Sequence, residues 1–216
     1  MPYDLIDNSV SIERMSLEDI NYFESVTSHK PFYLMIKRLL DLFFVVLLAI
    51  PVLIIVLFFG ILVKLDSKGP MIFKHKRIGK DMKPFEAYKL RSMYLIDGPE
   101  VTFHDDIRIT RVGKIIRRFR IDELPQMFNV FLGQMSFIGP RPLAPKEYSD
   151  SHILFQKRTM VKPGISGLAQ VNGGSEIDNL TKLKFDTYYI ENISLLLDIK
   201  VFLKTFMVIF SGDGSR

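Results

Sequence analysis

The sequence predicts a helix-rich α/β (α+β) protein with one N-terminal membrane-inserted helix, further amphipathic helices at the membrane surface, and a small sheet. Two observations carry this prediction: an uncharged run of 22 residues from Leu42 to Val63, and behind it a mixture of strand-like segments and segments with helical periodicity. Of the 216 residues 25% are charged, which argues against a polytopic transporter. The absence of cysteine excludes a disulfide scaffold, cysteine-ligated metals and thiol catalysis.

The uncharged run is long enough to cross a bilayer as a helix, which takes roughly 20 apolar residues. A buried core helix is the alternative, but few soluble helices are apolar on all sides over this length. Pro51 lies near the middle, where proline kinks a helix. Basic residues flank both ends, so the charges favour neither orientation; they are Lys37, Arg38, Lys64 and Lys68. A re-entrant hairpin over residues 37–64, which enters and leaves by one face, fits both features, and a straight span remains the alternative.

Charge divides the remaining chain into two parts. Residues 1–36 carry six acidic and two basic residues, a net charge of −4, and we expect them to form an acidic N-terminal extension. Residues 64–216 carry 25 basic and 17 acidic residues, a net charge of +8. We expect residues 65–216 to form a basic domain, which would favour an anionic lipid surface and phosphorylated molecules. Nucleic acid is the generic alternative partner, but no nucleic-acid-binding motif is visible.

Two strands and a basic helix are expected after the membrane segment. The strands lie at 70–73 and 85–90, joined by a turn region from Gly79 to Pro84. In the helix, arginine and lysine occupy much of the space between apolar residues at helical spacing, which are Ile109, Val112, Ile115, Ile116 and Phe119. This helix is either a solvated basic face over a core, part of the membrane interface, or a surface for substrate phosphates.

An apolar helix is predicted next, from Pro125 to about Gly133, with Asp122 and Glu123 in its first turn. Near the end of the sequence, residues 194–210 form an amphipathic segment that three charged residues interrupt. We expect this segment to lie in the membrane interface or to pack on the core, since its charges oppose a membrane span.

The adjacent carboxylates of Asp122 and Glu123 are the first candidates for catalysis. An ionised aspartate can attack phosphorus, and a neighbouring glutamate can tune it, move a proton or hold a metal. The pair alone is a weak signal, because most such pairs are solvated helix starts. Two rigid turns follow, GPRP at 139–142 and KPGISG at 162–167. Such turns present an arginine and backbone N–H groups to an oxyanion such as phosphate.

Together these segments resemble the bacterial sugar transferase family, the monotopic phosphoglycosyl transferases, over residues 37–204. Six motifs occur in one order, which is far more specific than a single glycine-rich loop. They are KRLLDL at 37–42, KLRSM at 89–93, RIT at 108–110, IDELPQMFNVFLGQMSFIGPRPL at 121–143, KPGISGLAQVNG at 162–173 and FDTYYIENISLLLDIK at 185–200.

The resemblance implies transfer of a sugar phosphate from a UDP-sugar to polyprenyl (undecaprenyl) phosphate, which releases UMP and begins glycan assembly. It implies a covalent route in which Asp122 attacks the β-phosphorus, and polyprenyl phosphate then attacks the phosphosugar–aspartate. It also implies Mg2+ as a cofactor near Asp122, and a place on the cytoplasmic face of the bacterial inner membrane. Membrane lipids would then be partners, and nucleic acid would not.

The resemblance also assigns roles to individual residues. Glu123 matches the second carboxylate, and Arg141, which follows Pro140, matches the arginine expected to bind phosphate or nucleotide. Lys89 and Arg117 match basic positions with phosphate-binding or structural roles, and Gln170 matches a glutamine of the turn region. Four residues depart from the family pattern: Ile50 replaces a serine, Ile107 a proline, Gln134 an aspartate and Gly174 an arginine.

Two other interpretations stay open at this stage. One is a catalytically silent membrane-anchored adaptor of a glycan-assembly complex, although the Asp-Glu pair and the GPRP turn argue against it. The other is a metal-independent transferase that acts in one direct step. We expect the small single-domain type of transferase. The residues do not reveal the sugar or the glycan pathway, and the oligomeric state stays open, a homodimer included.

Overall fold

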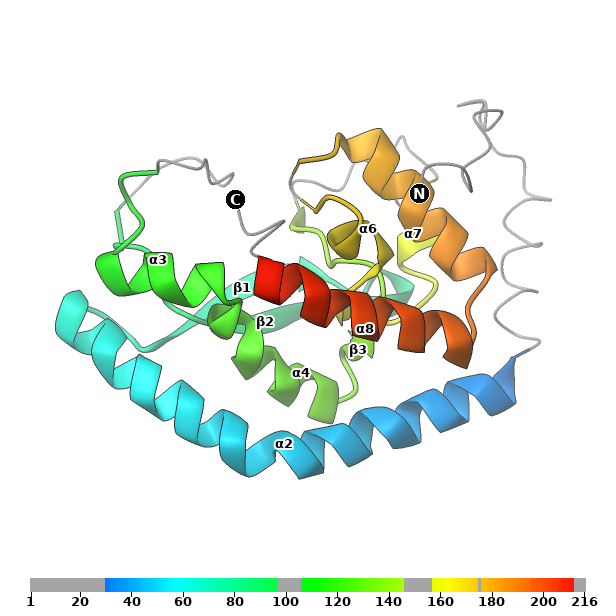
Figure 1. The fold of residues 1–216 in the computed structure, drawn as a ribbon, viewed down its shortest axis with the longest axis horizontal. Helices are drawn as coiled ribbons and strands as arrows, with labels where there is room; N and C mark the ends of the chain where they lie inside the picture. Colours follow the sequence, from blue (N-terminus) through cyan, green and yellow to red (C-terminus); the bar gives the residue numbers. More distant parts are fainter. Residues whose placement is uncertain (1–29, 97–105, 146–156, 175, 212–216) are drawn as a thin grey trace.

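The computed structural model describes residues 30–96, 106–145, 157–174 and 176–211. One long helix, α2 (Pro31–Asp66), runs along an edge of the molecule, and the other elements lie to one side of it (Figure 1). In chain order these are β1 (Ile72–Ile78), η2 (Lys80–Met82), β2 (Pro84–Leu90), α3 (Arg111–Arg118), η3 (Ile121–Gln126), α4 (Met127–Phe131), β3 (Ser136–Ile138), β4 (Gly164–Ser166), α6 (Leu168–Val171), α7 (Asn179–Glu191) and α8 (Leu195–Ser211). The predicted helix-rich α/β class is confirmed.

Helix α2 exposes almost all of its apolar surface. Val46 is 71% and Ile50 is 73% exposed, and in the described residues α2 is the only helix long and apolar enough to cross a membrane. A core helix would bury such side chains, because each gains roughly 25 cal/mol per Å2 of apolar surface removed from water. The helix therefore is not a core helix, and it indicates membrane association.

Pro51 lies inside α2, and the helix bends near its middle without interruption (Figure 1). A proline removes one backbone hydrogen bond and leaves its neighbours in place, which produces a bend rather than a chain reversal. The two halves form one continuous helix and are not separate arms joined by a turn. The helix also extends beyond the predicted segment 37–64 at both ends. That both ends face the same side of a bilayer stays a prediction.

Polar contacts join the first half of α2 to the rest of the chain. The sequence predicts Lys37 and Arg38 only as charges at the end of the membrane segment. In the structure both side chains also bind groups of the protein. The contacts are Lys37 Nζ to Asp198 Oδ2 at 2.7 Å, Arg38 Nη1 to Val130 O at 2.6 Å, Arg38 Nη2 to Phe131 O at 2.9 Å, and Asp41 Oδ1 accepting from Ser136 Oγ at 3.0 Å and from Phe137 N at 3.1 Å. Because these bonds are directional, they fix the register of the helix, which apolar packing alone specifies less tightly.

The sheets are two small pairs of strands. β1 and β2 are antiparallel, with Ile72 opposite Leu90 and Ile78 opposite Pro84, and β3 and β4 are parallel. The predicted strand at 70–73 has the wrong bounds. The second half of β1 contains several basic residues, and such a segment is more typical of an exposed loop than of a strand. The strand forms there because β2, which alternates buried and exposed residues, offers it a complete hydrogen-bonding edge.

The predicted helices differ from the observed ones in two respects. The apolar segment from Pro125 is not one helix, since η3 contains Pro125 and gives way to the short α4 at Met127. Helix α7 was not predicted, because its buried face includes the charged Asp186 and the apolar Leu180 lies outside that face, 44% exposed, so the sequence shows no clear amphipathic period. The buried residues are Leu183, Phe185, Asp186, Tyr189 and Ile190. The basic helix forms as α3, and α8 closely matches the predicted amphipathic segment at 194–210.

Asp198 of α8 provides a test of how α2 is attached. Its carboxylate accepts hydrogen bonds from Tyr33 at 2.7 Å, Lys37 at 2.7 Å and Tyr189 at 2.6 Å. We expect Asp198→Ala to lower the free energy of unfolding by about 3 kcal/mol, because it removes the shared acceptor of one buried donor, Tyr189, and two partly buried ones, Tyr33 and Lys37. Denaturant unfolding in detergent micelles, followed by circular dichroism, measures this. Lys200→Ala, on the exposed side of the same helix, serves as the control, and equal stability of the two variants would contradict the prediction.

Candidate active site

Three segments far apart in the sequence meet at the Asp122–Glu123 pair. β2 contributes Lys89, η3 contributes both carboxylates, and the loop after β3 contributes Arg141. Between α3 and η3 the chain turns at Arg120, whose φ of 54° is left-handed, a conformation that costs a non-glycine residue roughly 1–2 kcal/mol. Asp122 and Glu123 follow this turn and are buried, 8% and 7% exposed.

Three cations surround the carboxylate of Glu123. Its Oε1 lies 2.8 Å from Lys89 Nζ and 3.2 Å from Arg141 Nη1, and its Oε2 lies 3.8 Å from Arg120 Nη1. Burial on its own would raise the pKa of Glu123, but the charges of Lys89, Arg141 and Arg120 outweigh it, and the net shift is downward. Glu123 is therefore ionised at neutral pH and is a poor candidate for moving a proton.

Asp122 is left with its acceptor sites open. Within the part of the chain that the structure describes, its carboxylate has no hydrogen-bond donor and no cation within 4.0 Å. Burial raises the pKa of Asp122, the neighbouring charge of Glu123 adds to this, and the cations, Lys89 foremost, oppose it. A buried carboxylate without partners is costly. Both oxygens of Asp122 are therefore unpaired within the described residues, although the side chain itself is buried.

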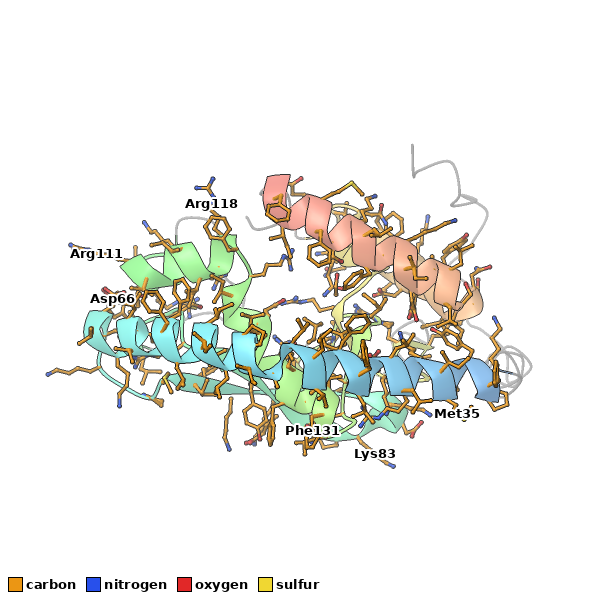
Figure 2. All side chains as sticks on the ribbon, turned by 60° about the horizontal axis from the view of Figure 1, so that its bottom comes forward. Met35, Asp66, Lys83, Arg111, Arg118 and Phe131 are labelled. Atoms are coloured by element: carbon orange, nitrogen blue, oxygen red, sulfur yellow. The ribbon has the colours of Figure 1, made fainter. Side chains whose placement is uncertain are left out.

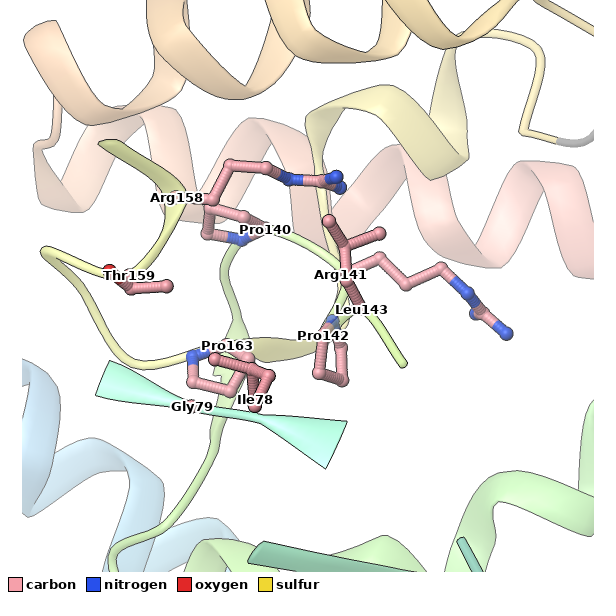
Figure 3. Close-up of a pocket in the computed structure, with 9 residues that line it drawn as sticks. All are labelled: Ile78, Gly79, Pro140, Arg141, Pro142, Leu143, Arg158, Thr159 and Pro163. Carbon is pink, nitrogen blue, oxygen red and sulfur yellow. The ribbon is translucent and has the colours of Figure 1, made fainter. Parts of the chain in front are cut away.

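Two small hollows share Arg141 and Pro142 in their linings; Glu123 lines one of them, and Asp122 lines neither. One hollow contains Glu123 and Lys89, together with Arg77 and Gln126, which the sequence reasoning missed. The other is lined by Arg141 and Arg158, whose side chains extend toward the same side in Figure 3, together with Pro140 and Thr159. Arg141 thus stands at the boundary, with its side chain 42% exposed, where it can reach a ligand in either hollow.

The other predicted site residues lie around this centre without joining it. Gln170 Nε2 donates to Ile165 O at 3.1 Å, so this side chain supports β4 instead of meeting the carboxylates. The carbonyl of Pro140 accepts from Gly164 N at 2.9 Å and ties the GPRP turn to the same strand. Arg117 lies on α3, half-buried, and its charge lowers the pKa of Asp122. Pro51 is within α2, and the structure does not bring it to the site.

Asn129 of α4 is a supporting residue that the sequence reasoning missed. It is fully buried, its Nδ2 donates to Glu86 O at 2.7 Å and to Gln134 Oε1 at 2.8 Å, and its Oδ1 accepts from Tyr88 N at 3.1 Å. The side-chain amide thus pairs with the edge of β2 that β1 leaves open, as a neighbouring strand would. It fixes the segment carrying Glu123 against the strand carrying Lys89. An asparagine among the apolar residues of α4 was the available signal.

The residues present suit a magnesium ion only if a substrate supplies further ligands. In the described residues, no three His, Asp or Glu side chains gather as a metal cage, and the oxygens of Glu123 face cations. Mg2+ is commonly held by one or two carboxylates together with substrate phosphates. Asp122, with both oxygens open, fits that arrangement.

The chain belongs to the bacterial sugar transferase family. The family described as "Bacterial sugar transferase" matches residues 32–212, a range that contains all of α2 but its first residue, the Asp122–Glu123 pair and both rigid turns.

Curated relatives support the same assignment. The chain is 42% identical over 196 residues to the UDP-N-acetylgalactosamine-undecaprenyl-phosphate N-acetylgalactosaminephosphotransferase of Aeromonas hydrophila, covering 86% of the chain and 46% of that protein. It is 42% identical over 187 residues to the UDP-glucose:undecaprenyl-phosphate glucose-1-phosphate transferase of Klebsiella pneumoniae, covering 82% and 40%. It is 38% identical over 183 residues to the uncharacterized sugar transferase EpsL of Bacillus subtilis, covering 84% and 90%. The chain thus spans less than half of the first two proteins.

The titration of Asp122 tests the electrostatics of the site. We expect its carboxyl to titrate above the ordinary aspartate range, because burial disfavours the charged form. Lys89→Met should shift the pKa of Asp122 further upward, because Lys89 is the largest charge that favours the carboxylate. The measurement is 13C NMR of carboxyl-labelled aspartate, with the Asp122 signal assigned by its loss in Asp122→Asn. Lys76→Met, an exposed lysine on β1, is the control; an Asp122 pKa at or below the ordinary value would contradict the prediction.

Proposed function

We propose that the protein transfers a sugar-1-phosphate from a UDP-sugar to undecaprenyl phosphate, which gives undecaprenyl-diphosphate-sugar and UMP. The observation that carries this proposal is a buried aspartate with open oxygens beside a glutamate that three cations surround. The names of the relatives from Aeromonas hydrophila and Klebsiella pneumoniae support the donor and acceptor classes. The relatives differ in their sugar, so the sugar of this protein is left to a donor panel.

The proposed reaction needs no general acid or base, which agrees with the ionised state of Glu123. A carboxylate oxygen of Asp122 attacks the β-phosphorus, and the bond between that phosphorus and the bridging oxygen breaks, so UMP leaves with the electron pair as an anion. An oxygen of undecaprenyl phosphate then attacks the same phosphorus and the Asp122 carboxylate leaves. Both nucleophiles are already anions, so neither step requires proton transfer.

The cations reduce the repulsion between an anionic nucleophile and an anionic donor. Lys89, Arg120 and Arg141 bring three positive charges against the carboxylate of Glu123, next to Asp122. Arg141 is the most exposed of the three, and we assign it to the diphosphate, with Glu123 holding it in place between turnovers. Lys89 and Arg120 hold Glu123, which keeps its charge away from the incoming phosphate.

Mg2+ is proposed as the cofactor, held by Asp122 and the donor diphosphate. When bound, it would neutralise phosphate charge and polarise the phosphorus–oxygen bonds. The role of this chain is to present Asp122 unpaired and to keep the cations clear of its oxygens.

The membrane placement follows from the exposed apolar surfaces. We propose that α2 inserts from the cytoplasmic face, with both ends at that face. We also propose that α8 and α4 lie in the membrane interface. Figure 2 shows Phe131 of α4 beside α2. Large apolar side chains on the outer sides of α8 and α4 are about half-exposed or more, and they are Leu196, Ile199, Leu203, Met207, Phe128 and Phe131. A donor from the cytoplasm and an acceptor from the leaflet could then use one site in turn.

The covalent route is tested by Asp122→Asn. We expect UMP release to fall by about 1,000-fold or more, because the amide is a far weaker nucleophile. Intact mass spectrometry of the native chain after donor alone should show a phosphosugar adduct that Asp122→Asn lacks. Asp81→Asn is the matched control, since Asp81 is exposed and its left-handed backbone (φ 55°) tolerates asparagine. Full activity without an adduct would instead support a direct one-step transfer.

Removal of Mg2+ provides a separate test. With excess EDTA we expect UMP release to fall by roughly 100-fold, because the diphosphate then meets Asp122 without a divalent cation. The thermal unfolding midpoint without donor should stay unchanged, because the described residues contain no metal cage. Addition of Mg2+ should restore the rate. Undiminished UMP release in EDTA would contradict the cofactor assignment.

A further inference from the structure

Helix α3 presents a face to solvent that mixes basic and apolar residues. Arg111, Lys114 and Arg118 are exposed, and Ile115 and Phe119 are 51% and 50% exposed. Their spacing places all five on one stripe of the helix. The opposite side of α3 is buried through Gly113 and Ile116. The helix is therefore amphipathic, but its outer face carries large apolar side chains that a fully solvated face would not need.

The cations on this face have no acidic partners. Within the described residues, no carboxylate lies within 4.0 Å of Arg111, Lys114 or Arg118, and the Arg118 guanidinium lies over the ring of Phe119 at 5.7 Å. Three uncompensated positive charges beside two half-exposed apolar groups match the surface of an anionic bilayer, where cations meet phosphates and apolar groups enter the boundary of the acyl chains.

Helix α3 lies beside the end of α2 at which the uncharged run stops, and its outer face points away from α2 (Figure 2). Its buried side packs on the second half of α2, with Val63 and Ile116 fully buried in one cluster, and Val112 N donates to Asp66 Oδ2 at 3.0 Å. In both Figure 1 and Figure 2, α3 lies beside the Asp66 end of α2. The uncharged run of α2 ends at Val63, so this end of the helix leaves the apolar layer where α3 begins.

We propose that the outer face of α3 binds an anionic lipid surface and forms a second membrane contact beside α2. This inference rests on the membrane insertion of α2 proposed above. A role in binding substrate phosphates is less well supported, because Arg117 is the α3 residue whose charge bears on Asp122, while the three outer cations lie on the other stripe. The contact would also steady the turn at Arg120, through which α3 leads into the Asp122–Glu123 pair.

The sequence contains no tryptophan, so the fluorescence of a single introduced tryptophan can be assigned to its position. Phe119→Trp, reconstituted into nanodiscs of phosphatidylcholine and phosphatidylglycerol with brominated acyl chains, should show quenched fluorescence. Phe58→Trp, on the exposed apolar surface of α2, reports insertion of that helix. Phe73→Trp, a half-exposed aromatic on β1, is the matched control and should stay unquenched.

The charges are tested in the Phe119→Trp background. Replacement of Arg111, Lys114 and Arg118 by Gln should reduce the quenching by at least about half in nanodiscs rich in phosphatidylglycerol, since each cation near an anionic surface contributes roughly a fivefold preference. The matched triple variant replaces Lys76, Lys80 and Lys83 of the β1–β2 hairpin by Gln and should leave the quenching unchanged.

In detergent, UMP release by the α3 triple variant should stay within about twofold of the parent, because none of its changes touches the site.

The outcomes separate this inference from the proposed function. Quenching at position 58 without quenching at position 119, or equal quenching in the two triple variants, overturns the α3 contact and leaves the transferase proposal standing. Absence of quenching at both positions overturns the insertion of α2 as well. A change at position 119 on addition of an oligonucleotide, without quenching in nanodiscs, would also overturn the inference and reassign the face to nucleic acid.

Discussion

The neutralisation of Glu123 by three cations is the interaction on which the rest of the site depends. A buried carboxylate is stable only when opposite charges accompany it into the interior, and here they arrive from β2, from the left-handed turn at Arg120 and from the loop after β3. Because the cations meet Glu123, they leave the neighbouring Asp122 without a partner. Glu123 thus joins the three segments of the site through ion pairs, and Asp122 has no ion-pair partner among the described residues.

The attachment of α2 imposes a second constraint, since an apolar helix in lipid has little to fix its rotation and register. Lys37, Arg38 and Asp41 supply that specificity through directional bonds to α8, α4 and β3. Arg38 binds carbonyls at the end of α4, while η3, which leads into α4, carries Asp122 and Glu123. The position of α2 and the position of the carboxylates are therefore connected through one short segment.

Sequence reasoning found the long apolar helix, the basic helix and β2, because each has a strong local pattern. It missed α7, whose buried face contains the charged Asp186, and it misplaced β1, whose basic residues look like a loop until β2 pairs with them. Asn129 was overlooked because an asparagine in an apolar segment has no periodic signature. Its role exists only where an open strand edge lies beside it, and no local pattern encodes that edge.

By itself, the sequence determined the apolar anchor, the basic character of the domain behind it, and the adjacent carboxylates with their rigid turns, because length, charge and motif order are properties of the chain. Only the tertiary structure decided how the two carboxylates differ. Asp122 and Glu123 are neighbours with the same chemistry, and nothing local assigns the cations to one of them. Folding does so, because Lys89 and Arg141 approach from distant segments and reach Glu123 alone within ion-pair distance.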